Sequence, residues 1–219
     1  MTNKMNKTLI ITGGYIDENF LKEWFTKENY SMIIAADRGL MVADRLNLPL
    51  DFIVGDFDSV SKEILQKYEK LSTPIQTFPR EKDKTDTQIA IELALMHNPS
   101  SIDIIGATGS RMDHILANLH LLLLPLQLNV DASIIDAHNK IYLKTKRFHI
   151  KKDTQFGQFL SLLPFHEKVT GLTMKGFKYP LDRVTLDFDS TLCISNEIVE
   201  EEAMVDLVEG ILIVIEARD

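Results

Sequence analysis

Apolar and polar positions follow two different patterns along this chain. Up to about residue 138, short apolar runs alternate with segments whose apolar residues recur at helical spacing, which is typical of βαβ units and a mostly parallel sheet. After that point helical periodicity nearly disappears, and short alternating runs are separated by turn residues. We therefore expect an α/β fold in which a mostly parallel α/β sheet domain, residues 1–137, precedes a small β-sandwich domain, residues 138–219.

These patterns predict the individual elements. In the first domain the expected strands are residues 8–12, 32–36, 52–54, 75–78, 102–105 and 132–136. The expected helices between them are residues 18–27, 40–46, 61–70, 85–97 and 112–124. In the second domain the expected strands are residues 141–143, 159–163, 169–174, 192–194 and 211–216. Helix 85–97 has the clearest pattern, because Ile89, Leu93 and Met96 form an apolar stripe and Thr85 or Asp83 can cap its first turn.

Composition and charge narrow the class of partner. The formal charge of −8 and a pI near 5.3 speak against a nucleic-acid partner, which needs a clustered basic surface, and favour small molecules. The single cysteine, Cys193, offers neither a disulfide nor a paired-cysteine metal site. We expect no export signal and no membrane span, and interpret the longest apolar run, residues 119–128, as a buried helix end. The expected location is the cytoplasm.

The first candidate for chemistry is the run Gly55-Asp56-Phe57-Asp58-Ser59, directly after an expected strand. Ligands of parallel α/β sheets bind at the carboxyl ends of strands, so Asp56 and Asp58 are placed to hold a hard cation, most naturally Mg²⁺. The alternative is a solvated turn in which Asp58 or Ser59 caps the next helix.

A second acidic cluster lies at the start of helix 85–97. Asp83 and Asp86 are three residues apart and share one side of the first turn, where they could complete a metal site. The interleaved Arg80, Lys82 and Lys84 could neutralise phosphate charge. Taken alone, however, the cluster favours the simpler interpretation of helix capping and a surface network of ion pairs.

The third candidate, Gly106-Ala107-Thr108-Gly109-Ser110-Arg111-Met112-Asp113-His114, joins an expected strand to an expected helix. Its glycines let backbone N–H groups approach an anion, and Arg111 can bind phosphate oxygens. It matches neither the Walker A motif nor the dinucleotide-binding glycine motif. Two weaker motifs, Thr12-Gly13-Gly14 and Ala36-Asp37-Arg38-Gly39, follow other strands, so such residues gather at one edge of the sheet.

The order and spacing of these motifs resemble the thiamine pyrophosphokinase family over nearly the whole chain. The resemblance includes Gly13-Gly14, Asp37 with Gly39, the Gly55 to Ser59 run, Lys82-Asp83 with Thr85-Asp86, and the Gly106 to His114 loop. In the second domain it includes Gly171-Leu172-Thr173, Gly176-Phe177-Lys178-Tyr179-Pro180-Leu181 and Ser195-Asn196-Glu197. One departure is Arg38, where the family more often has glycine.

The resemblance implies a Mg²⁺-dependent enzyme with ATP as co-substrate and thiamine as acceptor, and a homodimer with active sites at the subunit interface. The metal ligands would be Asp56, Asp58, Asp83 and Asp86, and the residues acting in catalysis Asp56, Asp58, Asp86, Arg111 and Asp113. ATP would bind to Asp37, Arg80, Lys82, Thr108, Gly109, Arg111 and His114, and thiamine to Gln88, Ser195 and Asn196.

Two other functions fit part of the sequence. Asp56-Phe57-Asp58-Ser59-Val60 and Asp187-Phe188-Asp189-Ser190-Thr191 both match the start of haloacid-dehalogenase-like phosphatases, in which the first aspartate would be a nucleophile. The second copy lies in the β-rich region without a following helix, and the glycine loop with Arg111 has no role in that scheme. A nucleotide or thiamine sensor without turnover is the other alternative, although all the candidate aspartates are present.

Overall fold

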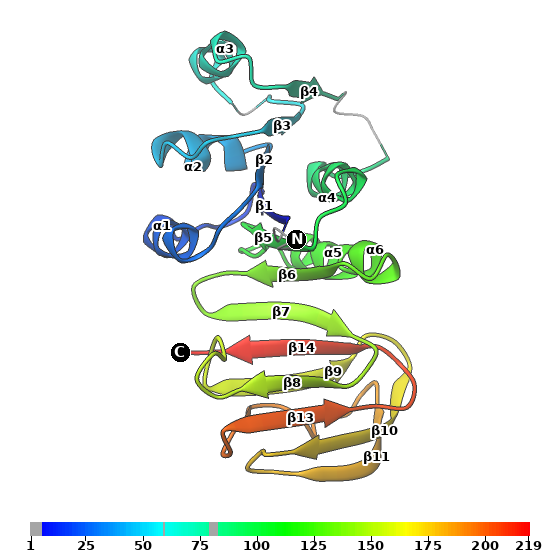
Figure 1. The fold of residues 1–219 in the computed structure, drawn as a ribbon. Helices are drawn as coiled ribbons and strands as arrows, with labels where there is room; N and C mark the ends of the chain where they lie inside the picture. The colour runs from blue at the N-terminus through cyan, green and yellow to red at the C-terminus, as the bar shows by residue number, and fades with distance from the viewer. Residues whose placement is uncertain (1–5, 59, 79–82) are drawn as a thin grey trace, which may run out of the picture. The chain divides into compact units, whose positions relative to one another are not determined.

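The computed structural model describes residues 6–58, 60–78 and 83–219 of the chain. It divides into two compact units, Met1–Ala137 and His138–Asp219, and we describe each by itself. The first unit is an α/β unit and the second contains β-strands, turns and loops in its described residues (Figure 1).

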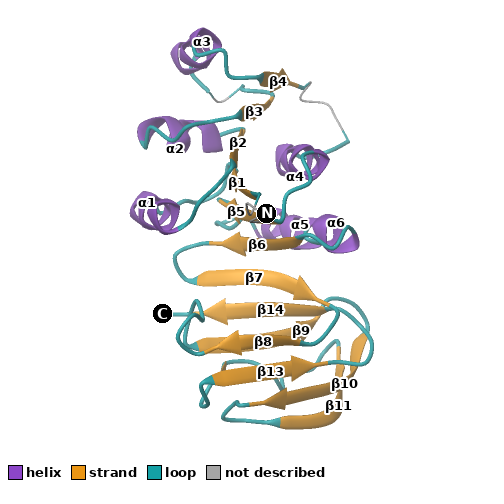
Figure 2. Cartoon of the chain, viewed as in Figure 1, coloured by secondary structure: helices purple, strands orange, loops and turns teal. Residues whose placement is uncertain are grey.

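The strands of the α/β unit are parallel and follow the order β6-β5-β1-β2-β3-β4. The strands are β1 (Lys7–Ile11), β2 (Met32–Ala36), β3 (Phe52–Gly55), β4 (Ile75–Thr77), β5 (Ser101–Ile105) and β6 (Asp131–Ile135). The helices are α1 (Glu18–Lys27), α2 (Gly39–Arg45), α3 (Lys62–Lys70), α4 (Asp86–Met96), α5 (Met112–Leu121) and α6 (Leu123–Gln127). Helices α1, α2 and α3 lie on one face of the sheet, and α4, α5 and α6 lie on the other (Figure 2).

Because helices cover both faces, the central strands are buried on both sides and are almost entirely apolar, as Leu9, Ile10 and Ile11 of β1 illustrate. The chain places β1 to β4 successively toward one edge, then returns to add β5 on the free side of β1. The strand order therefore reverses between β1 and β5, and ligands of open α/β sheets bind outside the carboxyl ends of the strands at such a reversal.

The predicted strands and helices of this unit are confirmed, with ends shifted by a few residues, but two details were wrong. The helix expected at residues 112–124 is two helices, since α5 ends at Leu121 and α6 begins at Leu123. The residues interpreted as a buried helix end are only partly buried, because Leu128 is exposed. No helix in the described part of the chain is long and apolar enough to cross a membrane.

The apolar stripe expected on α4 was also wrong in part. The buried residues of the helix are Thr87, Ala90, Ile91, Leu93 and Ala94, whereas Met96 is exposed. The helix packs on β1, β2 and β3. Its almost uniformly apolar sequence gives little amphipathic signal from which to choose the buried face.

The second unit is the expected β-sandwich. Antiparallel strands in the order β12-β9-β14-β7 form one layer, and β11-β10-β13-β8 form the other. The strands are β7 (Asn139–Lys144), β8 (Phe148–Lys151), β9 (Phe159–Pro164), β10 (Lys168–Lys175), β11 (Leu181–Asp187), β12 (Asn196–Glu197), β13 (Glu202–Asp206) and β14 (Leu212–Ala217). Side chains of both layers meet in one core that includes Leu162 and Val214 from the first and Leu172 and Val205 from the second.

Four strands of the sandwich, β8, β11, β12 and β13, were not predicted, and the strand predicted at residues 192–194 is wrong. Those residues form a turn in which Cys193 is buried while Leu192 and Ile194 are exposed. The second phosphatase-like run begins at the last residue of β11 and continues into a turn, so no helix follows it.

Candidate active site

A cavity of about 890 Å³ lies in the α/β unit at the carboxyl ends of the parallel strands. The segments after β1, β2, β3 and β5 line it together with the first residues of α4 and α5. Its described lining residues are Thr12, Gly13, Gly14, Tyr15, Asp37, Arg38, Asp56, Asp58, Asp83, Lys84, Thr85, Asp86, Thr87, Gly106, Ala107, Thr108, Gly109, Ser110, Arg111, His114, Ile115 and Asn118. The cavity thus contains most of the residues proposed for phosphate and metal.

Two glycine-containing segments meet at the reversal of strand order. The Gly14 N–H donates to the Gly106 carbonyl at 2.7 Å, and the Tyr15 N–H donates to the Thr108 carbonyl at 2.9 Å. A Cβ atom at Gly14 would lie 2.3 Å from both of those carbonyl oxygens. Glycine is therefore required at residue 14 for the segments after β1 and β5 to approach this closely.

The carboxylates after β2 and β3 lie in a tightly turned backbone. Asp37 has a φ of 48°, a left-handed conformation that aspartate tolerates better than most residues. The Asp58 N–H donates to Asp56 Oδ1 at 3.1 Å, so the two aspartates form a local turn on the cavity wall. Ser61, not Asp58, caps the next helix, since its side chain accepts from the Ile64 N–H.

A buried hydroxyl pair holds the start of α4 beside the end of β1. Thr12 Oγ1 and Thr87 Oγ1 are 2.7 Å apart, and both residues are buried. Thr85 caps the helix by accepting from the Gln88 N–H, so the capping predicted for Thr85 is confirmed. This arrangement places Asp83 and Asp86 on the cavity wall.

Arg111 and Asp113 form an exposed ion pair at the end of the glycine loop. Arg111 Nη2 lies 2.6 Å from Asp113 Oδ2, and the Arg111 side chain lowers the pKa of Asp113 to about 2. Arg111 and His114 line the cavity, whereas Asp113 is not among the lining residues. Asn118, the buried residue of α5, donates from Nδ2 to the Ala107 carbonyl at 2.8 Å and so holds the loop in place.

Some predicted site residues are not brought to this cavity. Gln88 is not among its lining residues, and its Nε2 donates to Glu92 Oε1 at 2.9 Å. Lys84 Nζ binds the same carboxylate at 2.8 Å, and this hydrogen bond lowers the pKa of Glu92. Arg80 and Lys82 lie outside the described residues.

Ser195 and Asn196 belong to the β-sandwich unit. Ser195 is exposed with a φ of 56°, and its N–H donates to Ser161 Oγ at 2.9 Å. Asn196 is buried, and its Oδ1 accepts from the N–H groups of Tyr179 and Glu197 while its Nδ2 donates to the Tyr179 carbonyl. The Asn196 amide therefore fixes the backbone at Tyr179, whereas Ser195 is an exposed residue.

Sequence reasoning gave no role of their own to Tyr15, Thr87, Ser110 or Asn118, which also line the cavity. Tyr15 follows the Gly-Gly pair directly and Asn118 is a polar residue within an apolar helix, and these two signals could have identified them. Thr87 and Ser110 carry no comparable signal.

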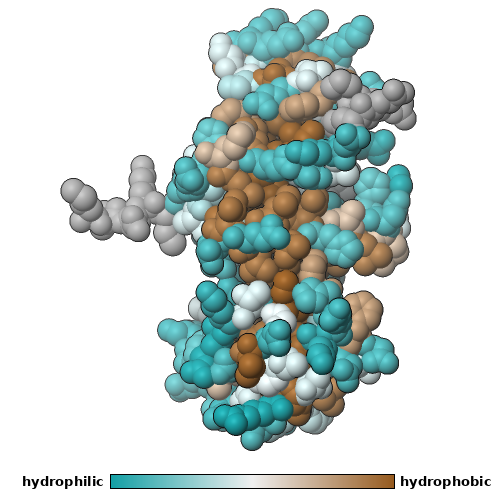
Figure 3. Space-filling model, turned by 90° about the vertical axis from the view of Figure 1, so that its right-hand side faces the viewer, coloured by the Kyte–Doolittle hydropathy of each residue, from teal (hydrophilic) through white to brown (hydrophobic). Residues whose placement is uncertain are grey.

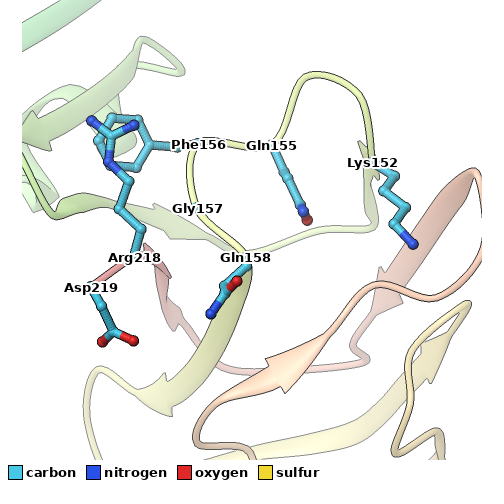
Figure 4. A pocket seen from close by; sticks show the side chains of 7 residues that line it. All are labelled: Lys152, Gln155, Phe156, Gly157, Gln158, Arg218 and Asp219. Carbon is cyan, nitrogen blue, oxygen red and sulfur yellow. The ribbon is translucent and has the colours of Figure 1, made fainter.

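A second, smaller cavity of about 360 Å³ lies in the β-sandwich unit. Figure 4 shows its lining residues Lys152, Gln155, Phe156, Gly157, Gln158, Arg218 and Asp219. The Arg218 guanidinium lies 4.6 Å from the centre of the Phe156 ring. None of these residues belongs to the predicted site.

Comparison with known proteins decides the family. The family described as "Thiamin pyrophosphokinase, catalytic domain" matches residues 25–134, and that described as "Thiamin pyrophosphokinase, vitamin B1 binding domain" matches residues 145–212. A thiamine pyrophosphokinase of Bacillus subtilis (strain 168) is 35% identical over 208 residues, which cover 94% of this chain and 91% of the relative. The chain belongs to the thiamine pyrophosphokinase family. This membership favours the pyrophosphokinase interpretation over the phosphatase.

Solved structures of the family share the fold. The crystal structure of thiamine pyrophosphokinase from Bacillus subtilis superposes with a TM-score of 0.87 at 31% identity and covers 98% of this chain and 100% of that one. The thiamin pyrophosphokinase structure from Geobacillus thermodenitrificans gives a TM-score of 0.84 at 30% identity, covering 97% and 98%. The α/β fold followed by a β-sandwich is therefore the fold of the thiamine pyrophosphokinase family.

Proposed function

We propose that this chain transfers the terminal pyrophosphate of ATP to the hydroxyethyl group of thiamine, giving thiamine diphosphate and AMP. The observation that carries the proposal is the cavity itself. Within a chain of this family it combines Asp56, Asp58, Asp83 and Asp86 with a glycine loop and Arg111 at the reversal of strand order.

The residues suit this chemistry because phosphoryl-type transfer depends on in-line positioning and charge neutralisation more than on covalent catalysis. The thiamine hydroxyl attacks the β-phosphorus of ATP, the bond to the α-phosphate oxygen breaks, and AMP leaves with that oxygen. Arg111 and the backbone N–H groups of the glycine loop would bind the phosphate oxygens. A cavity carboxylate would accept the hydroxyl proton.

The donor set suits Mg²⁺. Aspartate oxygens are hard ligands, and the four proposed ligands line one cavity, although the described residues contain no preassembled group of three acidic, histidine or cysteine side chains. Mg²⁺ usually binds through one or two carboxylates together with waters and substrate phosphates, so such a group is not required. When bound, the ion would neutralise charge on the transferring phosphates.

Thiamine would bind with the help of the β-sandwich unit. The exposed Ser195 hydroxyl is available to hydrogen-bond the aminopyrimidine, and Asn196 would shape that site by holding the Tyr179 backbone. Gln88 stays a candidate thiamine contact, and would have to exchange its bond to Glu92 for one to the substrate.

We further propose a cytoplasmic homodimer with active sites at the subunit interface. Apolar side chains gather on the face of the α/β unit that carries α4, α5 and α6 (Figure 3). On α5, Met112 and Leu116 are exposed and Asn118 is its buried residue. Large apolar side chains that gather on an exposed face often mark a surface that another protein covers, which supports an interface between copies of the chain.

The test is incubation of the purified protein with ATP, Mg²⁺ and thiamine, with chromatographic separation of the products. We expect equimolar thiamine diphosphate and AMP, formed only when thiamine and Mg²⁺ are both present. Inorganic phosphate with ADP, independent of thiamine, would instead indicate the phosphatase. Binding of both substrates without any product would indicate the sensor.

A further inference from the structure

Tyr15 lines the active-site cavity, and the proposed chemistry gives it no role. It follows Gly14 directly and is 69% exposed. Among the lining residues that the structure describes, it is the only phenylalanine, tyrosine or tryptophan. A large aromatic ring that lines a cavity and stays in contact with water offers a face against which a planar ligand group can pack.

The backbone of Tyr15 is fixed at the reversal of strand order. Its N–H donates to the Thr108 carbonyl at 2.9 Å. A Cβ atom built on Gly109 would lie 3.2 Å from Tyr15 N and 3.6 Å from Tyr15 Cβ, so the residue is packed against the glycine loop. No hydrogen bond of the Tyr15 hydroxyl occurs within residues 6–58, 60–78 and 83–219, so the ring is available to a ligand while its attachment is rigid.

Tyr15 and two of the aspartates that line the cavity belong to segments that lead to opposite faces of the sheet. Asp83 and Asp86 lie at the start of α4, whereas the chain after Tyr15 continues into α1 on the opposite face of the sheet (Figure 2). Phosphates bound at the glycine loop and Arg111 would therefore lie beside Tyr15, which packs against that loop. In ATP the planar group attached to the phosphates is the adenine base, and bases stack on aromatic side chains with little dependence on base identity.

We propose that Tyr15 is a nucleobase-stacking residue. Its ring packs on the adenine of ATP and of the AMP product, while the glycine loop and Arg111 bind the phosphates. This inference rests on the proposed function, because it assigns the base subsite of the same nucleotide.

The test measures, by calorimetry in the presence of Mg²⁺, the dissociation constants of AMP and of inorganic tripolyphosphate, which has phosphates but no base. Tyr15→Ala should weaken AMP binding about tenfold and leave tripolyphosphate binding within about twofold of the wild type. Tyr15→Phe, which keeps the ring, should retain most of the AMP affinity, and Tyr15→Leu, which keeps only apolar bulk, should lose part of it. Phe188→Ala is the matched control, since Phe188 is 66% exposed in the other unit.

Unchanged AMP affinity in Tyr15→Ala would overturn the inference. Equal losses of affinity for AMP and tripolyphosphate would overturn it as well, because they would indicate damage to the phosphate loop. Wild-type protein that binds no AMP would also overturn it. Failure of the proposed function is a separate result. It would appear as wild-type protein that binds AMP with the predicted dependence on Tyr15 but forms no thiamine diphosphate.

Discussion

Two aspartates on the cavity wall are the residues on which the proposed metal site most depends. Asp56→Asn or Asp58→Asn removes an anionic oxygen donor, and turnover should fall roughly a hundredfold or more, because charge neutralisation by a bound metal contributes several kcal/mol to such reactions. Steady-state thiamine diphosphate formation measures the loss. Thermal unfolding should barely change, since Asp58 is exposed and Asp56 is only partly buried.

Asp153→Asn is the matched control, because Asp153 is an exposed aspartate in a turn of the other unit. It should retain wild-type turnover. Near-normal turnover in Asp56→Asn or Asp58→Asn would remove that residue from the metal site.

Among the described residues that line the cavity, Arg111 is the positively charged residue of the glycine loop. Arg111→Ala should reduce kcat/KM for ATP roughly a hundredfold or more, because a donor aimed at charge in the transition state is lost. Arg111→Lys should recover part of this, since lysine keeps the charge without the planar fork. Initial rates at varied ATP provide the measurement.

Arg147→Ala is a close control for Arg111→Ala. Arg147 is an exposed arginine that also pairs with an aspartate, Asp206, but in the β-sandwich unit. It should leave kcat/KM unchanged. If Arg111→Ala matched that control, the glycine loop would not bind ATP phosphates.

The Arg111 to Asp113 ion pair has a pH signature of its own. The pKa of Asp113 falls from 3.8 to about 2, so the pair stabilises the fold above about pH 4 and that contribution is lost as the pH falls toward 2. The stability effect is small, because the two side chains are 68% and 64% exposed. NMR titration should show the Asp113 pKa returning toward 3.8 in Arg111→Ala. A pKa that stays near 2 in that variant would exclude Arg111 as the cause of the shift.

At the scale of elements, helix α5 is joined to the glycine loop by a hydrogen bond from its buried Asn118 side chain. Asn118→Ala leaves the Ala107 carbonyl without its partner at 2.8 Å, which should lower the free energy of unfolding by about 1–3 kcal/mol. If Asn118 positions the loop, the KM for ATP should also rise while the KM for thiamine stays constant. Denaturant unfolding and initial-rate kinetics measure the two effects. A loss of stability with an unchanged KM for ATP would limit Asn118 to a structural role.

Strands and helices of the α/β unit could be predicted because each has a strong local signal. Strand β2 is a continuous apolar run and β1 ends in one, and Thr85 caps its helix as expected. In the sandwich these signals fail for several segments, although β7, β9, β10 and β14 were predicted. Strand β11 buries Leu186 and has no other fully buried residue, so it shows little alternation, whereas the apolar residues 192–194 form a turn that buries Cys193. Burial by the opposite layer, not local sequence, decides these segments.

The candidate site was predictable where residues follow strand ends, because parallel strands bring their carboxyl ends to one edge. Asp37, Asp56, Arg111 and the glycine loop line one cavity for that reason. Side-chain partners could not be read from spacing. Gln88 binds Glu92, and the Asn196 amide binds the backbone at residues 179 and 197. These hydrogen bonds depend on which groups the folded chain brings next to each side chain.

At the scale of the whole molecule, the proposed dimer predicts complementation between two inactive variants. Asp56→Asn would remove a proposed metal ligand from the α/β unit. Ser195→Trp would block the thiamine subsite with a bulky ring at an exposed position. If each site uses Asp56 of one subunit and Ser195 of the other, a mixed dimer contains one intact site and one doubly defective site. Such a dimer should have about half the activity of the wild type, because the two sites of a symmetric dimer are equivalent.

Co-expression of the two variants with different affinity tags, followed by purification through both tags, isolates the mixed dimer without relying on subunit exchange. Each variant purified alone should be inactive, and dimers of one variant carrying both tags should stay inactive. An inactive mixed dimer would place Ser195 and Asp56 of the same subunit in one site, because then both sites of that dimer are defective. Failure to recover any doubly tagged protein, while the wild type purified alone migrates as a monomer, would contradict the dimer itself.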